Sequence, residues 1–287
     1  MGLISVAIAA GGFLTLPMAG NGAISALLVQ GPAHIEIDYE GIVPVPVLGR
    51  TRAASASLVM DLTQRSYDVT TYARAEGVVD WFVDYNLAIV STGAITPYGV
   101  RPLRYDSANR DGAKNRRVIV EFSPAEVVVS VTPKYGDWGF PATTKTQMLE
   151  AADPLSAIVE LTLRADATQG NPCGGPMRIF DGKQRYDMRL KFIQRINFRS
   201  KAYSGPALIC DLEYVEIAGF KSRSAEQKAR DQADMKWSHL TLAELNGGTL
   251  TPPIKLEGRS KKRGKMTVQA TRLSYSPIAQ LTSDRSR

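Results

Sequence analysis

Apolar and polar residues alternate with a period of two along much of the chain, a pattern typical of half-buried antiparallel strands. The alternation extends over residues 33–131 and is interrupted by Gly, Pro, Asn and Asp. Its clearest run is 79–89, where Trp81 and Tyr85 share one face with aliphatic side chains. β-branched and aromatic residues at this spacing predict strands rather than helices.

The longest alternating run covers residues 185–199, where six apolar side chains share one face: Tyr186, Met188, Leu190, Phe192, Ile196 and Phe198. Arg185, Arg189 and Arg195 lie on the other, polar face, and only Ile193 and Gln194 interrupt the alternation. A strand of this length spans about 50 Å and must twist and curl. The fold class we predict is mainly β, a curved antiparallel sheet forming a barrel or half-barrel.

A second strand is predicted at 208–214, after a turn at Ser204-Gly205-Pro206. Its polar face carries Asp211 and Glu213. If the two strands form a hairpin, these carboxylates lie opposite the basic residues of 185–199, and cross-strand ion pairs explain the basic face without any ligand. The alternative is that the basic face binds anions.

Two short helices complete the predicted fold. Asp153 is an N-cap candidate, and Pro154 suits the first helical position, so we expect a helix over 154–164 that covers one end of the sheet. A polar stretch at 224–235 begins with capping-box character and predicts an exposed helix. We expect one barrel-like domain over 27–281, followed by a frayed tail at 282–287.

The N-terminal segment has the pattern of an export signal. Residues 3–16 are apolar, and small residues at 23–25 fit a cleavage site, so we expect 1–26 to be removed and the protein to be periplasmic. No Lys or Arg follows Met1, although a signal normally has a basic start. Three alternatives stay open: a start site further upstream, an uncleaved anchor in the inner membrane, and a buried N-terminal segment.

The chain contains two cysteines, Cys173 and Cys210, and their number and spacing match no metal site. In an exported protein they are expected to form a disulfide. A catalytic thiol at Cys173 would need a nearby base, and the chain has only His34 and His239, neither within a recognisable motif.

The 287 residues carry a formal net charge of +7, much of it in the segment 255–265, which contains Lys261, Lys262 and Arg263. This cluster is either a solvated hairpin loop or, together with Arg189 and Arg195, an anion-binding surface. Export argues against a nucleic-acid partner. Peripheral contact with a membrane is compatible with the charge.

Motifs for nucleotide binding and hydrolysis are absent from the sequence, so we expect neither an enzyme nor a cofactor. Asp80 and Asp84 share one strand face and are expected to be solvated. The aromatic side chains of the strand faces form either a surface for a hydrophobic or lipid-like ligand or a packed core: Trp81, Tyr85, Tyr186, Phe192 and Phe198. We therefore predict a binding or scaffold protein of the cell envelope. An interaction module for anionic cell-wall or outer-membrane components is the alternative, and the sequence does not determine the oligomeric state.

Several short segments carry a family resemblance: Asp153-Pro154-Leu155-Ser156-Ala157, the run from Ile179 to Asp187 after Cys173, Tyr203-Ser204-Gly205-Pro206-Ala207 before Cys210, and Ile217-Ala218-Gly219. From His34 onward the chain resembles a family of uncharacterised Gram-negative envelope proteins, domain of unknown function 3108. The resemblance implies a periplasmic protein with a curved sheet around a helix, similar to lipoprotein-carrier folds whose half-barrels hold acyl chains. No catalytic residue is known for the family. The basic segment 259–265 departs from its pattern.

Overall fold

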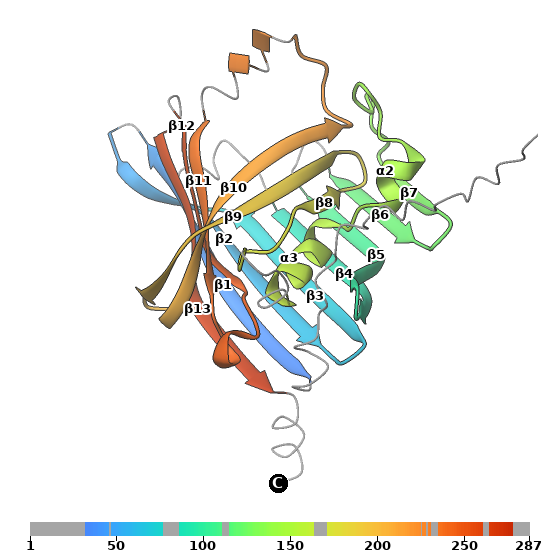
Figure 1. Ribbon diagram of the computed structural model, residues 1–287. Helices are drawn as coiled ribbons and strands as arrows, with labels where there is room; N and C mark the ends of the chain where they lie inside the picture. The colour runs from blue at the N-terminus through green and yellow to red at the C-terminus, as the bar shows by residue number, and fades with distance from the viewer. Residues whose placement is uncertain are drawn as a thin grey trace, which may run out of the picture.

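The computed structural model describes residues 32–45, 47–76, 86–110, 115–163, 171–224, 226–227, 229–230, 235–260 and 264–277. These residues form one antiparallel sheet of 13 strands with two α-helices (Figure 1). The strands are β1 (Ala33–Val45), β2 (Gly49–Leu62), β3 (Ser66–Ala75), β4 (Asn86–Thr96), β5 (Gly99–Asn109), β6 (Arg116–Phe122), β7 (Val127–Thr132), β8 (Met177–Phe180), β9 (Arg185–Arg199), β10 (Ser204–Ala218), β11 (Met235–Ala243), β12 (Pro253–Ser260) and β13 (Gly264–Pro277). The helices are α2 (Lys145–Leu149) and α3 (Pro154–Leu163), and a short 3-10 turn, η2, covers Asn246–Gly248.

Twelve strand pairings hold the sheet together, and eleven of them join strands that follow one another in the sequence. The exception is the pairing of β1 with β13, the first and last strands in the sequence. It leaves β7 and β8 at the two edges of the sheet. In the described pairing, β7 and β8 do not meet, so the sheet is an open half-barrel rather than a closed barrel. The predicted fold class is thereby confirmed.

The hairpin of β9 and β10 confirms the pattern read from residues 185–199. Phe192 lies opposite Cys210, whereas Gln194 lies opposite Ile209, so Ile193 is the extra residue of a β-bulge. Its side chain is exposed, as a bulged residue on a curled strand is free to be. The interruption of the alternation at Ile193 therefore marks a real register shift.

Helix α3 lies inside the curled sheet, between the half formed by β3, β4 and β5 and the half that contains β8 and β12 (Figure 1). Seven of the ten residues of the helix are buried, and the helix contributes to two hydrophobic clusters. Leu155, Val159 and Leu163 pack in one cluster, while Ala157 and Leu161 pack in the other. The expectation that this helix covers an end of the sheet was wrong, whereas the arrangement implied by the family resemblance, a sheet around a helix, was right.

Several predicted segments lie outside the described residues. These are the expected signal segment and tail, the strand region that contains Trp81 and Tyr85 together with Asp80 and Asp84, and the basic residues 261–263. Within the described part of the chain, no helix has the length and apolar character needed to cross a membrane.

Candidate functional site

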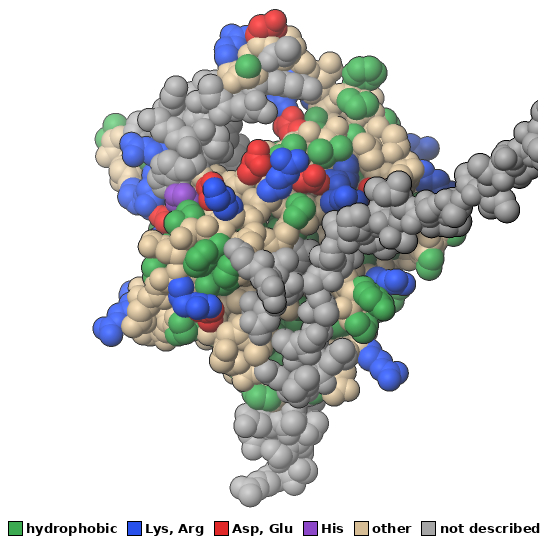
Figure 2. Space-filling model, viewed as in Figure 1, with side chains coloured by type: hydrophobic (Ala, Val, Ile, Leu, Met, Phe, Trp, Pro, Cys, Tyr) green, Lys and Arg blue, Asp and Glu red, His purple; other side chains and the backbone are tan. Residues whose placement is uncertain are grey.

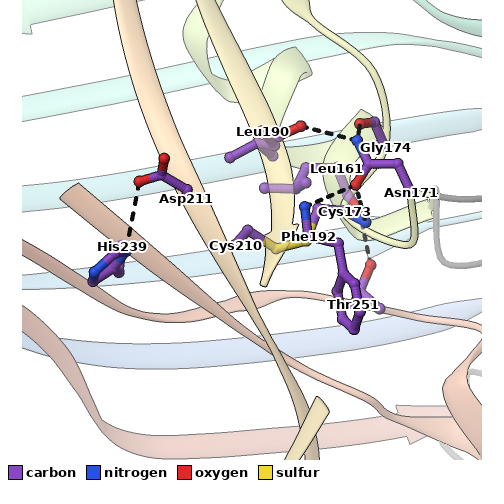
Figure 3. Close-up of a disulfide and its surroundings, with 10 residues drawn as sticks. All are labelled: Leu161, Asn171, Cys173, Gly174, Leu190, Phe192, Cys210, Asp211, His239 and Thr251. Atoms are coloured by element: carbon purple, nitrogen blue, oxygen red, sulfur yellow. Dashed lines mark hydrogen bonds and ion pairs between the residues drawn. A yellow bond between two sulfur atoms is a disulfide. The ribbon is translucent and has the colours of Figure 1, made fainter. Parts of the chain in front are cut away.

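The two cysteines are joined, as predicted. The disulfide of Cys173 and Cys210 links the loop after α3 to the inward face of β10, with Cα atoms 6.0 Å apart (Figure 3). Asn171 fixes the same loop to β9: its side-chain amide donates to the carbonyl of Leu190 at 2.9 Å, and its oxygen accepts from the amide of Phe192 at 3.1 Å. The disulfide thus anchors one end of the helical segment to the wall of the half-barrel.

A buried polar network anchors the other end of α3. The Asp153 carboxylate caps the helix by accepting from the backbone amides of Leu155 and Ser156, each at 3.0 Å, and it also accepts from the hydroxyls of Ser156 and Ser91. Tyr67 reaches the Ser156 hydroxyl at 2.5 Å. Burial raises the pKa of Asp153, and the hydrogen bonds from Ser156 and Ser91 oppose this shift. All members of the network have partners, so the cluster is suited to hold the helix in place.

Glycine at position 93 makes room for this network. A Cβ at Gly93 would lie 2.3 Å from the Tyr67 hydroxyl and 2.4 Å from the backbone oxygen of Arg101. A side chain on this part of β4 would displace the tyrosine from Ser156. The position therefore requires glycine for close approach.

The inward face of the sheet changes from buried to exposed along the strands. Cys210, Leu240 and Leu190 face α3 and the disulfide and are at most 9% exposed. Further along the same face, toward the end where β10 stops and β11 starts, the apolar side chains are only partly covered. We call the following residues the open inner surface: Tyr186 and Met188 of β9 and Leu212 and Tyr214 of β10, together with Leu256 of β12 and Val268 of β13, which lie in the cross-strand row of Cys210 and Leu240.

Two members of this surface are strongly exposed. Val268 lies opposite Leu256 and is 42% exposed, and Tyr214 lies opposite Met188 and is 48% exposed. The Tyr214 ring packs against Tyr186, with centroids 5.0 Å apart. Inward-facing apolar side chains without full cover are the feature expected of a site for a hydrophobic molecule.

The sheet also separates at this end. β10 pairs with β11 only from Ala207–Ala243 to Asp211–His239, although β10 continues along β9 as far as Ala218. Beyond Asp211 the described pairing joins β10 to β9 alone and β11 to β12 alone. In the described residues, the pairing of β10 with β11 thus ends beside Leu212 and Tyr214 of the open inner surface.

The predicted ligand-binding aromatics lie in different environments. Tyr186 belongs to the open inner surface, Phe192 packs against the cluster around the disulfide, and Phe198 packs against the main core. Trp81 and Tyr85 lie outside the described residues. The structure thus brings Tyr186 and Phe192 to one wall, and it separates Phe198 from them.

Two exposed arginines of β9 are ion-paired, and the partner of Arg189 is the one expected from the hairpin. Arg189 contacts Glu213 across the strands at 3.5 Å, and Arg195 contacts Glu244 through two nitrogens at 2.8 and 2.9 Å. Figure 2 shows the same mixing of charge, with Lys and Arg interspersed with Asp and Glu over the visible face. Two of the five residues of the predicted basic surface, Arg189 and Arg195, therefore have acidic partners. Lys261, Lys262 and Arg263 lie outside the described residues.

One arginine of the predicted polar face is buried instead. The Arg185 side chain is 5% exposed and donates to the carboxylate of Asp187 at 2.5 Å and to the carbonyl of Tyr186 at 2.7 Å. Arg185 starts β9 between Phe180 of β8 and Ala218 of β10, so strands cover it on both sides. The alternation correctly places Arg185 opposite the apolar face but does not predict its burial, because alternation describes the two faces of a strand and not what covers its end.

Both histidines lie beside carboxylates on the outward face. His34 contacts Asp61 at 2.6 Å and Glu36 at 3.1 Å. Burial lowers the pKa of His34, but the hydrogen bonds to these two carboxylates outweigh it and raise the pKa above the usual histidine value. His239 lies 3.6 Å from Asp211 (Figure 3). Within the described residues, no group of three or more His, Cys, Asp or Glu side chains could hold a metal ion.

A family model matches the chain. The model of the family described as "Protein of unknown function (DUF3108)" matches residues 36–230, more than half of the chain. The chain belongs to the DUF3108 family. No curated protein matches this DUF3108 chain. Among solved structures, it is similar to a beta-barrel-like protein of domain of unknown function DUF1849 from Brucella abortus, with 12% identity, a TM-score of 0.47, and coverage of 86% of this chain and 98% of the other.

Sequence reasoning missed part of the open inner surface of this DUF3108 chain. The alternation at 208–214 places Leu212 and Tyr214 on one face, so that part of the signal was available. Leu256 and Val268 could not be assigned to the same surface, because β12 and β13 join β9 and β10 only through β11, whose pairing with β10 the sequence pattern does not reveal.

Proposed function

We propose that this DUF3108 chain is a non-enzymatic protein of the periplasm that holds a hydrophobic or lipid-like ligand on its open inner surface. The observation that carries the proposal is the exposure of Val268 and Tyr214 on the inward face, next to fully packed residues of that same face. An apolar wall on the concave side of a curled sheet is sheltered from other macromolecules yet reachable by a slender ligand.

The energetics favour an apolar ligand. Covering a valine or leucine side chain completely is worth about 1.5–3 kcal/mol relative to leaving it in water. Six partly covered apolar side chains on one wall therefore offer several kcal/mol to a molecule that lies along them. The only charged side chain on the inward face of β10 beyond Tyr214 is Glu216, which is paired with Arg223 among the described residues.

A periplasmic location fits the chemistry of the chain. Disulfides persist in oxidising compartments and are rare in the cytosol. The bond between Cys173 and Cys210 is buried within a hydrophobic cluster, where it fastens the wall that carries the proposed ligand surface. Together with the expected export signal, this supports a role in the cell envelope.

The proposal is tested by ligand binding with a matched pair of variants. The full chain is exported to the periplasm, purified, and examined by native mass spectrometry for co-purifying lipid and by titration with dansyl-labelled undecanoic acid. Val268→Asn places a polar group on the open inner surface. Val90→Asn is its control, because Val90 is 39% exposed but lies on the outward face, opposite Thr70 and Asp106.

We expect the Val268 variant to bind the probe about tenfold more weakly and the Val90 variant to bind as the wild type does. Equal affinities for all three proteins, or a wild-type chain that takes up neither probe nor lipid, would contradict ligand binding and leave a scaffold role. The alternative of an anion-binding module is less well supported, because Arg189 and Arg195 already have acidic partners.

A further inference from the structure

Two hairpin tips lie next to each other at one end of the sheet. The β1–β2 tip contains Val47 and Leu48, and the β12–β13 hairpin ends at Ser260 and Gly264. Because β1 pairs with β13, the two hairpins are neighbours: a Cβ at Gly264 would lie 3.0 Å from the ring of Pro44. Figure 1 shows both at its upper left.

The β1–β2 tip exposes apolar side chains at a cost to the fold. Val47 is fully exposed and Leu48 is 58% exposed. Val47 also has a φ of 71°, in the left-handed region that a β-branched residue rarely adopts and that Asn or Gly would occupy easily. Nothing in the fold requires an apolar residue there, so the choice of valine and leucine suits contact with something outside the molecule.

The same two hairpins hold most of the net charge. Residues 41–52 contain two arginines, Arg50 and Arg52, and no acidic residue. Residues 257–267 contain five basic residues and one acidic residue, so the two segments together carry +6 of the formal net charge of +7. Arg50 and Arg259 are exposed, while Arg52 and Lys265 are paired with Glu76 and Glu257. Arg50 and Arg259 thus place exposed positive charge on strands close to the apolar tip, while Lys261, Lys262 and Arg263 lie outside the described residues.

We propose that this end of the molecule docks on an anionic lipid bilayer, with Val47 and Leu48 inserted among the headgroups and Arg50 and Arg259 in contact with lipid phosphates. Apolar side chains that insert, ringed by basic side chains, are the combination that holds peripheral proteins on membranes. Charge complementarity selects an anionic surface as the occupant. This inference goes beyond the proposed ligand site and does not depend on it.

Docking at this end would also orient the half-barrel. The antiparallel register places the end of β10 and the start of β11 at the same end of the sheet as the two hairpin tips. A docked molecule would therefore present its open inner surface to the bilayer, which is the arrangement needed to exchange a lipid-like ligand.

The test measures co-sedimentation of the full chain with vesicles of phosphatidylethanolamine and phosphatidylglycerol, and with vesicles of phosphatidylcholine alone. We expect binding to the anionic vesicles that weakens steeply with salt. The variant Val47→Asn with Leu48→Ser should lose about tenfold in affinity. Tyr98→Ser is its control, because Tyr98 is an exposed apolar residue on the β4–β5 turn at the opposite end of the sheet.

Charge is tested in the same way. Arg50→Gln with Arg259→Gln should lose about 25-fold, since each basic residue near an anionic surface contributes about fivefold. Arg65→Gln with Arg101→Gln removes equal charge from the opposite end of the sheet and should change little. Leu48→Trp supplies a second readout, a blue shift of its fluorescence on anionic vesicles.

Three results would overturn the proposal: no binding of the wild-type chain to anionic vesicles, equal losses for the tip and control variants, or self-association that the tip variant abolishes, which would assign the tip to a second copy. The tip substitutions lie outside the core, so unchanged binding of the dansyl-labelled probe would show that the variants are folded. The same measurement distinguishes a loss of vesicle binding from a loss of ligand binding at the open inner surface.

Discussion

The buried cap of α3 provides the sharpest test of how this fold is held together. In the variant Asp153→Ala, two helix amides and the hydroxyls of Ser91 and Ser156 lose a buried acceptor. Loss of an N-cap costs about 1 kcal/mol, and each buried hydroxyl without its partner costs about 1 kcal/mol more. The variant no longer buries a carboxyl group, which offsets part of this. We expect a net loss of about 2 kcal/mol in the free energy of unfolding.

The control is the exposed cap of α2. Thr144 caps that helix in a capping box with Gln147, at the surface. Thr144→Ala should cost at most about 1 kcal/mol, because water replaces the lost acceptor. Asp153→Asn should lie between the two, since the amide oxygen can still cap the helix. Urea denaturation followed by circular dichroism measures all three. If Asp153→Ala and Thr144→Ala cost the same, the buried network does not anchor α3, and the reasoning fails.

Two further predictions concern the disulfide and a histidine. Replacing Cys173 and Cys210 by serine should lower the free energy of unfolding by about 4 kcal/mol, which is the chain-entropy value for the loop that they close. Urea denaturation measures this change. An unchanged midpoint would show that the bond does not constrain the unfolded chain. The raised pKa of His34 should stabilise the fold fully below about pH 6.5, and this stabilisation should be lost as pH rises through the raised folded value. His34→Gln should remove that pH dependence from the thermal midpoint, and a wild-type midpoint that does not fall between pH 6 and 8 would contradict it.

Local patterns in the sequence are enough to predict much of the sheet. The alternation at 185–199 predicts β9 to the residue, and its interruption marks the bulge at Ile193. The Asp-Pro pair predicts the start of α3, because capping depends on neighbouring residues only. Cross-strand pairing of Arg189 with Glu213 follows from the hairpin alone.

Features that depend on distant segments could not be read in this way. The pairing of β1 with β13 joins residues more than 200 positions apart, and it alone places Val268 and the tip at Val47 in one region. Burial of Arg185 depends on its two neighbouring strands, and the position of α3 depends on curvature of the whole sheet. Alternation gives the face of a strand, whereas the cover over that face is a property of the assembled fold.

An open sheet of this size needs something other than edge pairing to hold its two halves, and α3 supplies it. At its N-terminus the helix is tied to β3 and β4 through Tyr67 and Ser91, and at its C-terminus Thr251 bonds to the carbonyls of Thr162 and Leu161 just before β12. The disulfide adds a covalent link from the following loop to β10. Helix α3 thus contacts strands of both halves, in addition to the pairing of β1 with β13 that joins them, whereas the described pairing of β10 with β11 ends at Asp211. These contacts hold α3 in place between the two walls of the half-barrel. A substitution that weakens them, such as Asp153→Ala, should therefore also disturb the open inner surface, although Asp153 contacts the opposite wall.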